Sequence, residues 1–182
     1  MRQFGHAVDR TAQAAKDRLR RFPGEVDMVI RGRTLTRGEL AMIRWMFGAI
    51  PNIERTRVYP LNFWWPYPND RAMTPNDNIF FPHQDFRDDF SLLSVDAGLR
   101  ALFMHEATHL YQHYVLGMWL MLRGPFDRNY DYQLERDKPL RAYGIEQMGQ
   151  IVEDFYLKRH GRRVLGRTSP LDAYADAVPV RS

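Results

Sequence analysis

The sequence of 182 residues predicts an α+β fold that is mainly helical, with a small, twisted and mostly antiparallel sheet. Apolar residues recur at helical spacing in two long stretches, residues 97–115 and 140–160. Residues 56–81 are rich in β-forming side chains interrupted by proline and asparagine, which favours short strands joined by turns. We expect an amphipathic helix over 1–24, a folded domain over 25–161 and a loosely ordered tail over 162–182.

Local signals predict the N-terminal elements. Residues 1–22 carry apolar side chains on one side of a helix, and residues 27–31 are expected to form a short strand. Thr36 and Glu39 have the spacing of a capping box, so we expect a helix to begin there and to end at Gly48.

The middle of the chain leads into the first long helix. Short strands are expected at residues 56–59, 63–65 and 79–81. Ser94 or Asp96 is the expected N-cap of the helix that follows. The second long helix is expected to begin at residue 139 or 140 and to end near residue 160, where a glycine follows.

The first long helix contains the motif His105-Glu106-Ala107-Thr108-His109, whose pattern is HExxH. Residues four apart lie on the same face of an α-helix, so His105 and His109 can direct their imidazoles at one metal ion. Glu106 projects beside that face, where its carboxylate can accept a proton from a water at the ion. The alternative is a structural histidine pair, which would bury the Glu106 carboxylate at considerable cost unless it were paired. The pattern predicts a zinc site with Glu106 as the general base.

A catalytic zinc site usually has three protein ligands and one position for water. His113 is the nearest further histidine, but in a straight helix it lies about 12 Å along the axis from His105, too far to share an ion. We expect it on the surface or beside a ligand. The extended motif HExxHxxGxxH needs glycine at position 112 and histidine at position 115, where this chain has Gln112 and Val115. That class of site is excluded.

The third ligand is therefore expected from an acid on the second long helix. We expect it to be Glu146, which lies early in that helix near two small residues, Gly144 and Gly149, that would let the helix approach the metal closely. Glu153 and Asp154 are the alternatives, and we expect them to be solvated or paired in salt bridges.

Other side chains near the expected ligands are candidates for supporting roles. Gln150 lies one turn after Glu146 and is expected to orient one of the two histidines by a hydrogen bond. Tyr130, Tyr132 and Tyr143 lie between or beside the ligands in the sequence. A phenol there can stabilise a developing oxyanion, or it can pack a loop against the helix.

This arrangement resembles the gluzincin branch of the zincin metallopeptidases, in which one helix supplies two histidines and the general base and a later helix supplies a glutamate. The resemblance covers residues 99–154. It implies that residues 25–161 form a zincin-like metal-binding domain with zinc as its cofactor. Gln150 is a departure, because many gluzincins carry an acid one turn after the glutamate ligand.

A second resemblance covers more of the chain. The segments that carry it are residues 31–39, 72–76, 79–81 and 89–91, the HExxH motif and residues 145–147. Together they resemble small bacterial Vgr-related proteins, which are similar to zincin-like modules found near contractile secretion and Rhs systems. This resemblance implies a bacterial source and a secretion-system partner, and it leaves the substrate open.

Composition narrows the range of partners. The chain has 26 basic and 22 acidic residues and a net charge of +4, so we expect a basic solvated surface and no nucleic-acid partner. The absence of cysteine excludes disulfides and a cysteine nucleophile.

Residues 1–22 lack the apolar core of a secretory signal, and the longest apolar run, residues 115–122, is too short to span a membrane. We expect a protein that is cytoplasmic or exported without a cleavable signal peptide.

The sequence therefore predicts a zinc-dependent hydrolase, most simply a metallopeptidase that cleaves an amide bond in a peptide, a protein or peptidoglycan. The rival hypothesis is a non-catalytic zincin-like metal-binding module that acts as a partner or accessory protein of a bacterial secretion system. The intact Glu106 favours the enzyme, because a purely structural metal site needs no base.

Overall fold

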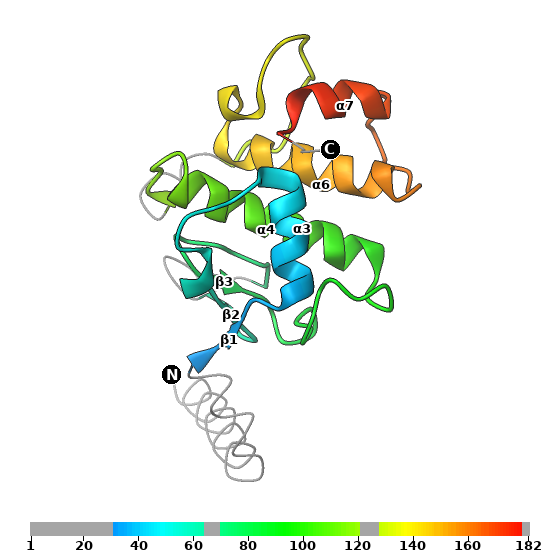
Figure 1. The fold of residues 1–182 in the computed structure, drawn as a ribbon. Coiled ribbons are helices and arrows are strands. Elements are labelled where there is room, and N and C mark those ends of the chain that lie inside the picture. Colours follow the sequence, from blue (N-terminus) through cyan, green and yellow to red (C-terminus); the bar gives the residue numbers. More distant parts are fainter. Residues whose placement is uncertain (1–30, 64–69, 121–127, 180–182) are drawn as a thin grey trace, which may run out of the picture.

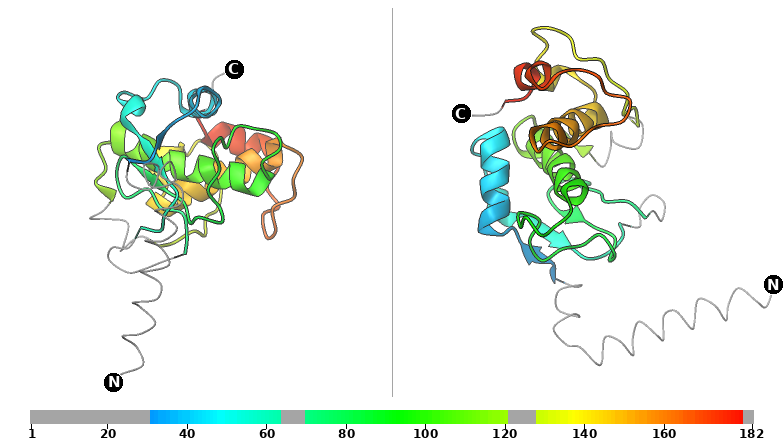
Figure 2. Two further views of the ribbon diagram at one scale, coloured as in Figure 1. Left: turned by 90° about the horizontal axis from the view of Figure 1, so that it is seen from below. Right: turned by 90° about the vertical axis from the view of Figure 1, so that its right-hand side faces the viewer.

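The computed structural model describes residues 31–63, 70–120 and 128–179. In chain order the elements are β1 (Arg33–Thr34), α3 (Arg37–Phe47), the 3-10 helix η1 (Ile53–Arg55), β2 (Arg57–Tyr59), β3 (Ile79–Phe80), α4 (Ala97–Tyr114), the 3-10 helix η3 (Leu140–Ala142), α6 (Ile145–Arg159) and α7 (Leu171–Ala177). Figure 1 shows α4 between the sheet and α6. In the same view, and in the right-hand view of Figure 2, α7 lies on the far side of α6 from the sheet.

The sheet has the strand order β1-β2-β3 and is mixed. Val58 lies opposite Arg33 in an antiparallel pair and opposite Ile79 in a parallel pair. The sequence predicted a mostly antiparallel sheet. A parallel neighbour needs a crossover rather than a hairpin, and the long connection from Tyr59 to Ile79 provides one. An isolated antiparallel bridge between Met73 and Phe80 adds a further pair beside β3.

Two of the expected strands differ from the observed ones. The predicted strand over 27–31 lies outside the described residues except for Arg31, which is helical, and β1 begins two residues later at Arg33. Of the predicted strand over 63–65 only Phe63 is described, and it lies in no strand. The amphipathic helix expected over 1–24 also lies outside the described residues.

The helix starts follow the local signals. The Thr36 side chain accepts a hydrogen bond from the Glu39 backbone N–H, and the Glu39 carboxylate accepts one from the Thr36 backbone N–H. The predicted capping box is therefore confirmed. Asp96 caps α4 by accepting a hydrogen bond from the Gly98 backbone N–H. α6 starts later than predicted, at Ile145, because residues 140–142 form a separate 3-10 turn.

A core of aromatic and aliphatic side chains joins the sheet to α4. The rings of Phe81 and Phe90 lie 4.4 Å apart, and those of Phe90 and Phe103 lie 5.2 Å apart. Phe103 lies on α4, two residues before His105, so the sheet side of the core fixes the helix that carries the motif. In the part of the chain that the structure describes, every helix is too short or too polar to cross a lipid bilayer.

The C-terminal segment differs from the expectation of a loose tail. Residues 171–177 form α7, and Tyr174 is completely buried. The Tyr132 hydroxyl donates a hydrogen bond to the buried Asp154 of α6 and lies 2.8 Å from the Tyr174 hydroxyl, which can donate to it in turn. The predicted tail over 162–182 is therefore wrong for residues 171–177, because these contacts join it to residues far away in the sequence.

Candidate metal centre

α4 presents two histidines side by side on its buried face. His105 and His109 are 4% and 6% exposed, and their ring centroids lie 5.2 Å apart. This is the arrangement expected from a spacing of four residues in a helix. The two imidazoles therefore face the same space between α4 and α6.

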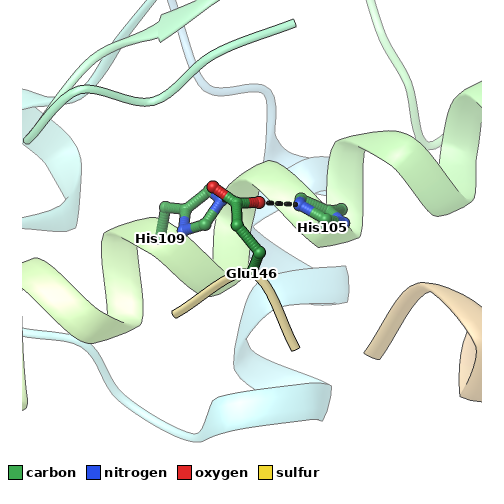
Figure 3. A group of neighbouring side chains, drawn as sticks. All are labelled: His105, His109 and Glu146. Carbon is green, nitrogen blue, oxygen red and sulfur yellow. Dashed lines mark hydrogen bonds and ion pairs between the residues drawn. The ribbon is translucent and has the colours of Figure 1, made fainter. Parts of the chain in front are cut away.

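The first turn of α6 brings an acid to the two rings, as Figure 3 shows. The Glu146 Oε2 atom lies 3.3 Å from His105 Nε2 and 3.6 Å from His109 Nε2. Each of the three residues offers one potential ligand atom, and these three atoms all lie within 4.8 Å of one another. The structure thus brings together the three residues that the sequence suggested as metal ligands.

Gly149 allows α6 to pass this close to His105. A Cβ atom at Gly149 would lie 2.6 Å from His105 Nε2 and 2.8 Å from two carbon atoms of the ring. Such distances are too short for any side chain. The expectation that a small residue permits the close approach therefore holds at Gly149, whereas Gly144 is the N-cap residue of α6.

Burial and hydrogen bonding shift the pKa values of the three clustered residues. Burial lowers the pKa of His105, but hydrogen bonds to Glu146 and Glu153 outweigh it and raise that pKa to about 10. Burial also lowers the pKa of His109, and the bond to Glu146 together with nearby acids raises it above its usual value. Burial acts to raise the pKa of Glu146, yet the two histidines hold it well below its ordinary range. These pKa shifts favour the charged forms of both imidazoles and of the Glu146 carboxylate, which face one another.

The outer nitrogen of each histidine ring has its own partner. His105 Nδ1 lies 3.0 Å from Glu153 Oε2, and His109 Nδ1 lies 2.8 Å from Gln112 Oε1. Sequence reasoning gave this role to Gln150 and expected Glu153 to be solvated or salt-bridged. Gln150 instead donates to Asp154 Oδ1 at 2.8 Å, so the expectation for Gln150 is wrong, whereas Glu153 does form an ion pair, with His105. The spacing of Glu153, seven residues after Glu146, was a signal for the same helix face.

The other candidates lie at different distances from the cluster. Tyr143 is away from it, because its hydroxyl accepts from the Glu135 backbone N–H and its ring lies beside Lys138. The ring of Tyr130 stacks on His105 with centroids 6.1 Å apart. His113 contacts the Met118 carbonyl through Nδ1 and does not join the cluster, in line with its expected place outside the site.

Glu106 is buried next to the histidines and is 3% exposed. The hydroxyl of Thr74 donates to Glu106 Oε2 at 2.7 Å, a contact that the sequence did not suggest. Thr74 follows Met73, which bridges to β3, so the sheet holds this donor in place. Burial raises the pKa of Glu106 above its usual value, although both histidines and Thr74 act to lower it.

Comparisons with known proteins place the chain among its relatives. No model of a known protein family matches it. It is 32% identical over 139 residues to the type VI secretion system spike protein VgrG2b of Pseudomonas aeruginosa, a match that covers 71% of this chain and 13% of the spike protein. The solved structure of the effector domain of Pseudomonas aeruginosa VgrG2b superposes with a TM-score of 0.66 at 30% identity, covering 80% of this chain and 83% of that one.

The two matches differ in how much of the relative they cover. The chain spans a small part of the whole spike protein but most of its effector domain. The resemblance to Vgr-related proteins predicted from the sequence is confirmed by both matches. The chain therefore belongs to the family of the VgrG2b effector domain.

Proposed function

We propose that this chain is a zinc-dependent hydrolase of zincin-like fold, most simply a metallopeptidase, in which His105, His109 and Glu146 hold the ion. The observation that carries the proposal is the convergence of two imidazoles and one carboxylate, from two helices, within 4.8 Å. A buried carboxylate, Glu106, lies directly beside them. This combination offers both a metal site and a base.

The residues fit zinc by their chemistry. Two nitrogen donors and one oxygen donor are a ligand set that catalytic zinc sites use, and three protein ligands leave a fourth position for water. Metal-binding histidines commonly bond a carboxylate or carbonyl through the other ring nitrogen, and Glu153 and Gln112 supply such oxygens here. When bound, a zinc ion supplies a Lewis acid that polarises the scissile carbonyl and lowers the pKa of water.

Glu106 supplies the general base in this proposal. Its Oε2 atom accepts the Thr74 hydroxyl, which leaves Oε1 to take a proton from the attacking water and pass it to the leaving amine. A pKa raised by burial makes this carboxylate a stronger base than an exposed one. Because a site that only holds structure has no use for a buried base, Glu106 favours the enzyme over the non-catalytic module.

The relatives indicate the cellular system in which the proposed activity would be used. VgrG2b is a type VI secretion system spike protein, and the solved relative is its effector domain. We infer that this chain also acts as an effector module of a secretion system. The substrate is then an amide bond in a peptide, a protein or peptidoglycan, the classes that such a site can hydrolyse.

Metal analysis of the purified protein is the first test. We expect about one equivalent of zinc per chain, as for a single three-ligand site, and we expect its loss in the variants His105→Ala and Glu146→Ala. His113→Ala is the matched control, because that histidine lies on the same helix and outside the cluster. A protein that neither carries zinc nor takes it up would overturn the proposal.

Hydrolysis assays then distinguish the zinc-dependent hydrolase from the non-catalytic metal-binding module. Glu106→Gln keeps the shape of the side chain but cannot accept a proton, so it should retain zinc and lose hydrolysis by roughly a hundredfold or more. Generic peptides and peptidoglycan fragments are both assayed. Equal activity in Glu106→Gln and wild type contradicts the mechanism, and zinc binding without activity in either supports the non-catalytic module.

A further inference from the structure

Gln112 is a completely buried side chain that is bonded at both ends. Its Oε1 atom lies 2.8 Å from His109 Nδ1, and its Nε2 atom donates to the Ile145 carbonyl at 2.8 Å. His109 lies on α4, and Ile145 is the first residue of α6, directly before Glu146. One amide therefore connects a histidine of the cluster to the helix end that carries the acid.

The chemistry of these partners fixes the proton on the imidazole. A backbone carbonyl only accepts hydrogen bonds, so the NH2 group of Gln112 must face Ile145. The amide oxygen then faces His109, and because an amide oxygen only accepts, Nδ1 of that ring must carry a hydrogen. In the neutral ring this leaves the lone pair on Nε2, which is the nitrogen that faces Glu146.

We propose that Gln112 is a positioning residue of the metal centre: it holds His109 as the Nδ1–H tautomer and fixes the start of α6, and thereby Glu146, against α4. The inference rests on the proposed metal site. A glutamate in its place would accept at both ends and would face the Ile145 carbonyl without a hydrogen. Glu153 acts on one ring alone, whereas Gln112 ties a ligand on one helix to the backbone beside a ligand on the other.

The test compares Gln112→Met and Gln112→Glu with wild type. Met keeps the length and removes both bonds, and Glu keeps the acceptor for His109 and removes the donor for Ile145. Zinc affinity is measured by competition with a chelator, and the cobalt-substituted proteins are compared by visible absorption, which reports ligand geometry. We expect both variants to bind zinc roughly tenfold to hundredfold more weakly, the loss usual for a residue that orients a metal ligand.

Thr108→Val is the matched control. Thr108 is also completely buried on α4, and its hydroxyl bonds only the Met104 carbonyl of the same helix. It should bind zinc with an affinity close to that of wild type. If Gln112→Met also binds zinc within twofold of wild type and shows an unchanged cobalt spectrum, the positioning role is refuted while the metal site stands.

A measurement on the wild-type protein covers the case in which the variants fail to fold. Nitrogen NMR of the zinc-loaded protein distinguishes the two ring nitrogens of His109. We expect a protonated Nδ1 and a metal-bound Nε2. A His109 ring bound to zinc through Nδ1 overturns the inference, and absence of zinc binding in wild type overturns it together with the proposed function.

Discussion

Replacement of Gly149 by alanine tests how closely the packing of α6 sets the site. Gly149 lies inside α6, where alanine has the higher helix propensity by about 1 kcal/mol. From propensity alone, Gly149→Ala should stabilise the protein. The new Cβ atom, however, would lie 2.6 Å from His105 Nε2, the nitrogen that faces Glu146.

The steric effect outweighs the propensity. Non-bonded carbon atoms pack best at about 3.5–4.0 Å, so the ring or the helix must retreat by roughly 1 Å. Overpacking of a tight interior costs about 1–3 kcal/mol, which leaves a net destabilisation of about 0–2 kcal/mol. Metal–ligand distances tolerate only about 0.2 Å, so a shift of this size should also weaken zinc binding at least roughly tenfold to hundredfold.

A double-mutant cycle separates the two effects. In a His105→Ala background the ring is absent, so Gly149→Ala should now stabilise the protein by about 1 kcal/mol. Urea unfolding of the metal-free proteins gives the stabilities, and chelator competition gives the zinc affinity of Gly149→Ala. The reasoning is refuted if Gly149→Ala stabilises the protein by the same amount in both backgrounds and binds zinc as tightly as wild type.

Two further predictions concern Thr74, which contacts Glu106, and Arg167, which contacts Tyr130 and Tyr132. Thr74→Val removes the hydroxyl that donates to Glu106 and should lower hydrolysis by roughly tenfold with zinc content unchanged, whereas Thr74→Ser should restore the rate in the same assay. Arg167→Ala removes bonds to the carbonyls of Tyr130 and Tyr132 and the contact with the Tyr132 ring at 4.2 Å, and it should destabilise the protein by about 1–2 kcal/mol in urea unfolding, with no rescue by lysine.

The features that the sequence predicted correctly depend on spacing within a few residues. The Thr36–Glu39 capping box and the Asp96 cap are local patterns, and the structure has both. The pairing of His105 with His109 follows from one helical turn. The approach of Glu146 to the two histidines is a longer-range prediction, made from the need of a catalytic zinc site for a third ligand, and the structure has this approach.

The features that were missed depend on how distant segments pack. Glu153 reaches His105 only because α6 crosses α4 at this point, and Gln150, which seemed better placed by sequence, faces Asp154 instead. Thr74 reaches Glu106 across 32 positions of sequence, through the segment that bridges to β3. No local pattern encodes the contact of Thr74, whereas the seven-residue spacing from Glu146 did place Glu153 on the same face of the helix. The buried position of Tyr174 was missed for the same reason.

The packing of α4 on α6 also bears on how the three candidate ligands are held together. Met104 of α4 and Met148 and Ile151 of α6 are almost completely buried in the same core, and they need no ion to attract them. The two helices therefore meet through apolar contacts that lie beside the three charged residues. In small zinc-dependent domains, by contrast, the free energy of zinc binding drives the folding of the chain. Here the apolar core already brings the histidines and Glu146 together, so an ion bound as proposed would not have to fold the two helices around it.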